Sequence, residues 1–261
     1  MTAAAPRARR RVPPAVAAAI AGAWALALAA QAVGGGGRLH HDALIEGPLP
    51  YWAAVALFAA AWQVMIAAMM LPSSLPLIRL FAVASSGQPR PRGAMGAFLG
   101  GYGLVWTAFG AVAFAGDTVL HALVDRTPWL HERPWLIAGG VLLTAGAFQF
   151  TGLKDRCLHR CRHPGAFLLR HYRRGPGAAF RLGERHGMFC LGCCWALMLL
   201  MFAAGVASLW WMAALTALMV YEKSAPRGRQ SVPVTGALLV AWGGLVLAHP
   251  AWLPAALAGA I

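Results

Sequence analysis

The chain has 261 residues, of which 59% are hydrophobic and only 11% are charged. A soluble globular protein of this size needs more polar surface than this composition supplies, so we expect an integral membrane protein. The formal net charge of +14 would also suit a nucleic-acid-binding protein, but the arginines stand in short tracts between apolar segments. That pattern is typical of loops beside a membrane, so we expect a lipid bilayer and no nucleic acid as partner.

Apolar segments long enough to cross a bilayer recur along the chain. A spanning helix needs about 20 residues for roughly 30 Å of hydrocarbon. Suitable segments occur at 14–33, 51–71, 95–116, 135–153, 188–221 and 234–249. The 188–221 segment carries no charge and is too long for one span, and Gly205 to Ser208 followed by Trp210 indicates an interfacial break. We therefore predict an all-α polytopic transmembrane helical bundle of about seven spans, forming a single integral membrane domain over residues 1–261.

The first apolar segment also resembles a signal peptide. Basic residues at 7–11 precede it, and Ala30-Gln31-Ala32 forms a small-residue cleavage motif. Its length of roughly 20 residues favours retention as a span. Cleavage would leave six spans with the same orientation.

The distribution of lysine and arginine predicts which ends of the spans face the cytoplasm. With a cytoplasmic N-terminus, the only basic residues in outer loops are Arg38, Arg126 and Arg133. The longest loop, at 154–187, is then a basic cytoplasmic loop that contacts anionic lipid headgroups. The expected location is the bacterial inner membrane, with several passes through it.

The spacing of the cysteines indicates a local chemical site, since all five lie between Cys157 and Cys194. Cys157 and Cys161 are four residues apart, so they share one face if the fourth span continues as a helix past the membrane surface. A second set lies on one face near the start of the fifth span: Cys190, Cys193, Cys194 and, one turn earlier, His186. Because cytosolic thiols stay reduced, metal coordination or transient redox chemistry is favoured over structural disulfides.

Methionines and one glutamate extend this set of candidate ligands. Met65, Met69 and Met70 precede Pro72 at the expected cytoplasmic end of the second span, and Glu222 emerges at the same surface after the sixth. Thiolate and thioether ligands favour Cu(I), whereas cysteine with histidine equally suits Zn(II). The candidate metal ligands are Cys157, Cys161, Cys190, Cys193, Cys194, His186, Met65, Met69, Met70 and Glu222.

Several of these features also have simpler interpretations. Methionines on apolar helices commonly fill cores, and Glu222 can form an interfacial ion pair with its neighbour Lys223. His159, His163 and His171 lie among arginines, where solvent or lipid phosphates are their expected partners.

Three segments resemble an uncharacterised bacterial family described as predicted metal-binding integral membrane proteins. They are Trp62 to Pro72, Gly152-Leu153-Lys154 leading to Cys157, Cys161 and Pro164, and Gly192-Cys193-Cys194-Trp195-Ala196-Leu197-Met198 with Glu222-Lys223 beyond. The resemblance covers residues 51 to 223 and implies an integral membrane protein with a metal site, without an established activity.

The favoured interpretation is a membrane protein that binds a soft transition metal, copper before zinc, as a transporter or a metal chaperone. It would exchange metal with a donor or acceptor protein, and we do not expect it to be an enzyme. One alternative is a membrane thiol–disulfide oxidoreductase, because Cys190-x-x-Cys193 has redox spacing and Arg185 is nearby. A second alternative is an assembly factor with a structural zinc site. The sequence leaves the direction of any transport and the oligomeric state open.

Overall fold

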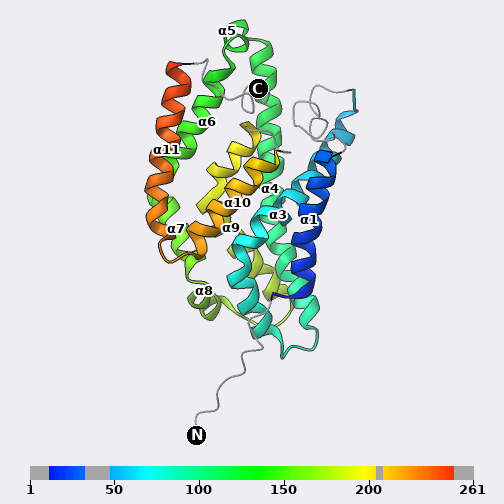
Figure 1. Ribbon diagram of the computed structural model, residues 1–261. Helices are drawn as coiled ribbons and strands as arrows, with labels where there is room; N and C mark the ends of the chain where they lie inside the picture. Colours follow the sequence, from blue (N-terminus) through cyan, green and yellow to red (C-terminus); the bar gives the residue numbers. More distant parts are fainter. Residues whose placement is uncertain (1–11, 33–47, 204–207, 250–261) are drawn as a thin grey trace.

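A computed structural model of the chain describes residues 12–32, 48–203 and 208–249 (Figure 1). Every regular element within these residues is an α-helix, so the predicted all-α helical bundle is confirmed. The helices in chain order are α1 (Pro14–Ala32), α3 (Tyr51–Ser85), α4 (Pro91–Asp125), α5 (Pro128–His131), α6 (Pro134–Phe148), α7 (Gly152–Arg162), α8 (Pro164–His171), α9 (Pro176–Ala203), α10 (Leu209–Ser224) and α11 (Gly228–Ala248).

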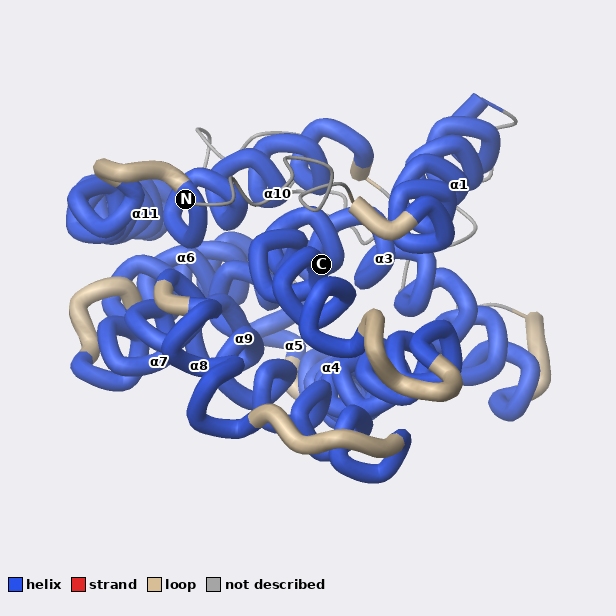
Figure 2. Tube along the Cα trace, turned by 90° about the horizontal axis from the view of Figure 1, so that it is seen from below, coloured by secondary structure: helices blue, strands red, loops and turns tan. Residues whose placement is uncertain are grey.

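The long helices run between two ends of the bundle. α1 and α11 lie at opposite edges in both views (Figures 1 and 2), and α9 packs against α4, α6 and α7. α7, α8 and the connection from α3 to α4 lie at the lower end in Figure 1, whereas α5 lies at the upper end. The basic residues of α7 and α8 therefore share one end of the bundle with those of the α3–α4 connection.

Among the described helices, four are long and apolar enough to cross a membrane, namely α1, α3, α4 and α11. α6 and α7 meet the same criterion as a pair, with a bend of 63° between them. α9 ends at Ala203 and α10 begins at Leu209, and the predicted break between them lies, apart from Ser208, at residues 204–207, outside the residues that the structure describes. The number of seven spans and the orientation of the termini stay predictions.

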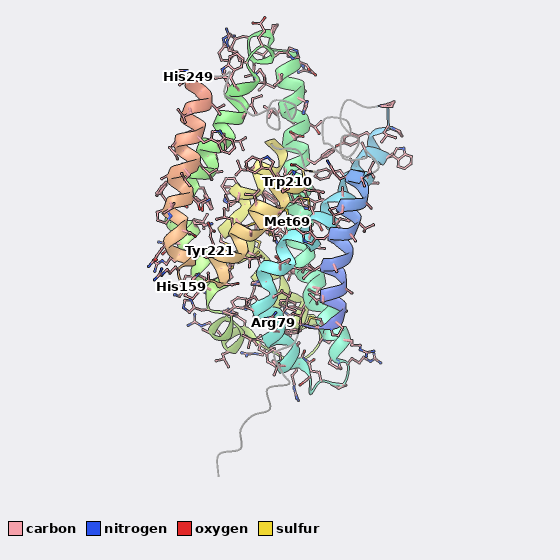
Figure 3. All side chains as sticks on the ribbon, in the orientation of Figure 1. Met69, Arg79, His159, Trp210, Tyr221 and His249 are labelled. Carbon is pink, nitrogen blue, oxygen red and sulfur yellow. The ribbon has the colours of Figure 1, made fainter. Side chains whose placement is uncertain are left out.

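The helix α3 is longer than the sequence predicts. We expected the span to end at residue 71, but α3 continues through Pro72 and Pro76 to Ser85. Its 35 residues extend over about 50 Å. The methionines expected at a helix end therefore lie inside a continuous helix, and Figure 3 shows Met69 near mid-height.

A contact from α1 compensates for one of these prolines. A proline inside a helix lacks the N–H that would bond the carbonyl four residues earlier, which for Pro72 is the carbonyl of Ala68. The indole N–H of Trp24 in α1 donates to that oxygen, with an N to O distance of 3.1 Å. This bond satisfies a backbone acceptor that an apolar environment would otherwise penalise, so α3 passes Pro72 without ending.

The fourth span does not continue straight into the first cysteine pair. α6 ends at Phe148 and α7 begins at Gly152, so the expected continuous helix is interrupted by the 63° bend. The side chain of Thr151 caps α7 by accepting a hydrogen bond from the backbone N–H of Lys154 at 3.2 Å. Threonine is favoured at this position because its oxygen satisfies a free N–H of the first turn. The cap starts a new helix that lies against α9.

Glycines bring two helix pairs into backbone contact. A Cβ at Gly101 in α4 would overlap the carbonyl of Phe180 in α9, and one at Gly183 in α9 would overlap the backbone of α4. A Cβ at Gly146 in α6 would lie 2.9 Å from the carbonyl oxygen of Gly236 in α11. Small residues permit such close helix approach inside membranes. The α4–α9 contact fixes the helix that carries three of the cysteines.

Candidate metal centre

Three buried thiols lie on one side of α9. The thiol groups of Cys193 and Cys194 donate to the carbonyl oxygen of Cys190, with sulfur to oxygen distances of 3.1 and 2.8 Å. These are the bonds expected between a side chain and the carbonyl one turn earlier. The three side chains are 0–1% exposed, so α9 presents its sulfurs to the interior of the bundle.

The thiols of α7 reach those of α9. The Sγ atoms of Cys161 and Cys193 are 3.9 Å apart. Cys157 packs against Gly192, where an added Cβ would lie 2.6 Å from the Cys157 sulfur. All five cysteines are buried and free. The two cysteine groups, which are separated in sequence, therefore meet across the α7–α9 contact.

A lysine ammonium lies among these thiols. The Nζ atom of Lys223, in α10, is 3.1 Å from the Cys190 sulfur and 3.9 Å from the Cys194 sulfur. It also donates to the hydroxyl of Ser73 in α3 at 3.0 Å. Sequence reasoning treated Lys223 only as an interfacial partner of Glu222. Its position directly after an apolar segment suggests a side chain that reaches toward the membrane surface, so only the packing of α10 reveals its contact with sulfur.

Glu222 pairs with a lysine from another helix. Its Oε2 atom is 2.6 Å from the Nζ atom of Lys154, and these side chains are 2% and 1% exposed. The guanidinium of Arg162 contacts the backbone carbonyl of Glu222 and donates to that of Ala225 at 2.9 Å. Among the described residues, the Oε1 atom of Glu222 is buried and has no hydrogen-bond partner. The carboxylate therefore ties α10 to α7 with one oxygen and has a second available.

His186 reaches the cysteines through two hydroxyl groups. Its Nε2 atom is 3.1 Å from the hydroxyl oxygen of Ser74, and that hydroxyl donates to Tyr102 at 3.1 Å. The Tyr102 hydroxyl in turn is 3.1 Å from the Cys190 sulfur. The imidazole and the phenol ring also stack, with centroids 5.5 Å apart. Tyr102 and Ser74 were not predicted as site residues because a single hydroxyl in an apolar span has no distinctive sequence pattern.

The methionines of α3 are buried beside this polar network. Met65, Met69 and Met70 are 0–2% exposed. The carbonyl oxygen of Met70 accepts hydrogen bonds from Ser73 at 2.9 Å and from Tyr102 at 3.4 Å. The backbone of Met70 therefore contacts the same tyrosine that reaches Cys190. The burial of these side chains suits core packing as well as a ligand role.

In the part of the chain that the structure describes, no three histidine, cysteine or acidic side chains converge as a ready-made metal site. The sulfurs of α9 instead interact with the Cys190 carbonyl, the Tyr102 hydroxyl and the Lys223 ammonium. Metal binding would require these weak sulfur hydrogen bonds to be exchanged for bonds to the ion.

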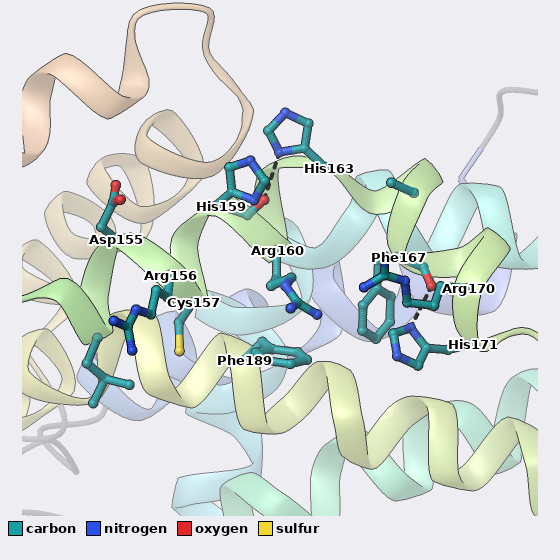
Figure 4. A pocket seen from close by; sticks show the side chains of 12 residues that line it. Asp155, Arg156, Cys157, His159, Arg160, His163, Phe167, Arg170, His171 and Phe189 are labelled. Atoms are coloured by element: carbon teal, nitrogen blue, oxygen red, sulfur yellow. Dashed lines mark hydrogen bonds between the residues drawn. The ribbon is translucent and has the colours of Figure 1, made fainter.

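A pocket of about 680 Å³ opens beside Cys157. Figure 4 shows it between α7, α8 and α9, with the Cys157 sulfur directed toward α9. The residues predicted to face solvent or lipid, His159, His163 and His171, also line it. The cysteine group thus has one member at a surface opening.

One comparison with known proteins gives a match. A family model named PpoB2 and described as a copper chaperone matches residues 59–246, which include all five cysteines and extend from α3 to α11. No curated protein and no solved structure matches the chain. The match agrees with the metal-related family that the sequence resembles.

Proposed function

This chain belongs to the PpoB2 family of copper chaperones, and from that premise we propose that it binds Cu(I) with its buried thiols and transfers the ion to a partner. The proposal depends on one observation, the 3.9 Å distance between the sulfurs of Cys161 and Cys193. A zinc–thiolate bond is about 2.3 Å long, so two sulfurs less than about 4.6 Å apart can bind one ion at bonds of that length. Cys161 and Cys193 satisfy this requirement.

The other proposed ligands surround this pair. Cys190 and Cys194 lie on the same side of α9 as Cys193, and Cys157 is one turn from Cys161 on α7. A site with several thiols and nearby thioethers prefers Cu(I) to hard ions, so Met65, Met69 and Met70 are proposed as secondary ligands. Zn(II) is the metal that competes with this assignment.

The proposed site also includes two acid–base residues, His186 and Glu222, which do not bind copper when it first enters. His186 contacts the cluster through Ser74, and Glu222 is engaged by Lys154. Among the described residues, the Oε1 atom of Glu222 already has no hydrogen-bond partner, and the Nε2 atom of His186 becomes available if its contact with Ser74 is exchanged. Their proposed role is to receive the ion after the thiols, during transfer.

We further propose that the protein acts within the bacterial inner membrane, with the α7–α8 end in the cytoplasm. The apolar helices and the gathering of arginines at that end support this location. A reducing cytosol would keep all five cysteines available for metal. The basic segment 154–187 would then lie at the cytoplasmic surface of the membrane.

The test is elemental analysis of full-length protein purified in detergent without oxygen and loaded with Cu(I). We expect bound copper in the wild type and a loss of affinity of more than about tenfold in Cys161→Ser and Cys193→Ser, since even residues outside the ligand set change metal affinity by 10–100-fold. Met188→Leu is the matched control, because Met188 is exposed on the same helix. Equal copper affinity in the cysteine variants and the control would contradict the proposal. If the purified protein retains zinc and not copper, the metal of the site is Zn(II).

A contact in the site supports one second candidate, thiol–disulfide chemistry. Lys223 donates to the Cys190 sulfur at 3.1 Å, and Cys190 stands three residues before Cys193, the spacing of redox motifs. Such an enzyme needs a reactive thiolate, so the metal-free protein should alkylate rapidly at Cys190 near neutral pH. Slow alkylation that a Cu(I) chelator accelerates would favour metal binding instead.

A further inference from the structure

The surface pocket beside α7 has the dimensions of a small-molecule site. Its volume of about 680 Å³ lies within the usual range of roughly 300–1,000 Å³ for ligand pockets. Cys157 is the one cysteine among the described residues that line it. A ligand in this pocket would therefore lie beside one thiol of the cysteine group.

The charge of the pocket selects for anions. Arg156, Arg160 and Arg170 line it, and all three are exposed. Asp155 is the one acidic residue among its described lining, and Arg229 already binds both carboxylate oxygens of Asp155, at 3.0 and 3.2 Å. Arginine stays charged at any physiological pH and binds carboxylates through two parallel hydrogen bonds. The pocket therefore suits a ligand with carboxylate groups.

An aromatic ring in its lining makes the pocket suitable for an organic ligand. The ring of Phe189, in α9, lines the pocket, and the guanidinium carbon of Arg160 lies 5.2 Å from its centroid. Figure 4 shows Cys157 beside this ring, with Arg156 and Arg160 close by. The guanidinium is held over the ring by a cation–π interaction. A ligand with both apolar and anionic parts would meet a matching surface.

The sulfurs continue from the pocket into the protein. Cys157 and Cys161 lie one turn apart on α7, and the Cys161 sulfur is 3.9 Å from that of Cys193. Cys193 belongs to the three buried thiols of α9, of which Cys190 and Cys194 lie 3.1 and 3.9 Å from the Lys223 ammonium. The series of thiols thus leads from a surface opening to the interior cluster.

We propose that this pocket binds an anionic low-molecular-weight thiol complex of Cu(I) and that Cys157 exchanges copper with it. The inference rests on the proposed copper function and names the partner that the site uses. A reducing cytosol is rich in such a thiol, glutathione, whose carboxylates would meet the arginines while its sulfur carries the ion. Cys157 is then the first protein ligand in the series.

The exchange is a ligand substitution without a change of oxidation state. Copper enters as Cu(I) bound to the carrier sulfur, the bond from Cu(I) to the Cys157 sulfur forms, and the bond to the carrier sulfur breaks. The Cys157 thiol proton passes to the released carrier sulfur, which leaves as a free thiol. No electron acceptor or donor is needed, and the reverse sequence loads the carrier.

The experiment compares two copper sources with two sets of variants. Full-length protein in detergent, reduced and free of oxygen, receives Cu(I) either as its glutathione complex or as its cationic acetonitrile complex, and bound copper is measured after rapid desalting. The pocket variant carries Arg156→Gln, Arg160→Gln and Arg170→Gln. The control variant carries Arg79→Gln, Arg90→Gln and Arg92→Gln, three exposed arginines outside the pocket at the same end of the bundle.

We expect the pocket variant to take copper from the glutathione complex about tenfold more slowly than the wild type, since charge complementarity acts mainly on association rate. The control variant should change by less than about twofold, because its charges act only at long range. With the cationic acetonitrile complex, the pocket variant should be no slower than the wild type, because the loss of positive charge does not hinder the approach of a cation. Cys157→Ser should slow uptake from glutathione while the remaining four thiols still bind copper from acetonitrile.

Three results would overturn the inference. Equal uptake from glutathione by the pocket and control variants would show that overall charge, not the pocket, governs transfer. Slowing of the wild type by anionic phospholipid, with no preference for glutathione over acetonitrile, would assign the pocket to lipid headgroups. Unchanged uptake by Cys157→Ser would remove its role as acceptor. Failure of the proposed function is distinct, because the wild type would then bind copper from neither source.

If the triple variant does not fold, Arg170→Gln alone replaces it. Arg170 is exposed on α8, away from the α7–α9 contact, so folding should be preserved. Thermal unfolding midpoints of all variants, measured without copper, verify that transfer rates are compared between folded proteins.

Discussion

The contact between α6 and α11 differs from the interior formed by α7, α9 and α10 in the kind of side chain that it buries. α6 and α11 meet through glycines and apolar side chains, with Gly146 against Gly236. The α7, α9 and α10 interior buries five thiols and the Lys154–Glu222 ion pair. Close helix packing therefore needs no polar group in this fold. The buried charges in the second region, which lose hydration without improving packing, are better explained by chemistry than by stability.

The ion pair provides the strongest test of that difference. Lys154→Met would leave the Glu222 carboxylate buried without its partner, and breaking a buried pair in this way costs about 3–5 kcal/mol. Replacing both residues, by Lys154→Met and Glu222→Leu, should restore much of the lost stability because no unpaired charge is left. The measurement is the free energy of unfolding in detergent. A single variant as stable as the wild type would mean that the carboxylate is already neutral or solvated.

The stability of the glycine contact between α6 and α11 should depend on added side-chain volume and not on charge. Gly146→Ala would add a Cβ 2.8 Å from the backbone nitrogen of Val240, and we expect a loss of about 1–3 kcal/mol from overpacking. Gly140→Ala is the matched control on the same helix, since nothing lies within 4 Å of its added Cβ. Copper bound per folded molecule should not change in either variant. A loss of copper in Gly146→Ala would couple the two regions and weaken the comparison.

The contact between α1 and α3 is intermediate between these two regions, because a hydrogen bond from Trp24 to the Ala68 carbonyl joins its otherwise apolar helices. Trp24→Phe removes the donor to the Ala68 carbonyl and should cost about 0.5–1.5 kcal/mol. In a Pro72→Ala background, residue 72 regains an N–H that can bond the same carbonyl. The tryptophan substitution should then cost less, and a double-mutant cycle measures the coupling. Additive effects of the two substitutions would show that the indole does not compensate for the proline.

The sequence predicts the helical class and the shared face of the three α9 thiols because both follow from periodicity. Apolar segments define the helices, and spacings of three and four residues place Cys190, Cys193 and Cys194 on one face. These features depend on neighbours within a few residues.

Other features depend on how distant segments pack. Where α3 continues through Pro72, the free carbonyl of Ala68 accepts a hydrogen bond from Trp24 in α1, 44 residues away in the chain. Lys223 faces the cysteines and Glu222 faces Lys154 because adjacent residues on a helix point about 100° apart. Which of the two directions meets sulfur is decided by the placement of α10, and no local pattern records it.

The absence of a side chain at Gly192 sets the spacing between the sulfurs of α7 and those of α9. A methyl group there would collide with the Cys157 sulfur at 2.6 Å and would push α7 outward while leaving every donor atom in the chain. In the copper site that we propose, the distance between the sulfurs of α7 and α9 would therefore depend on one carbon atom at a residue that is not itself a ligand. A substitution at position 192 would then be expected to change how tightly the proposed site retains copper.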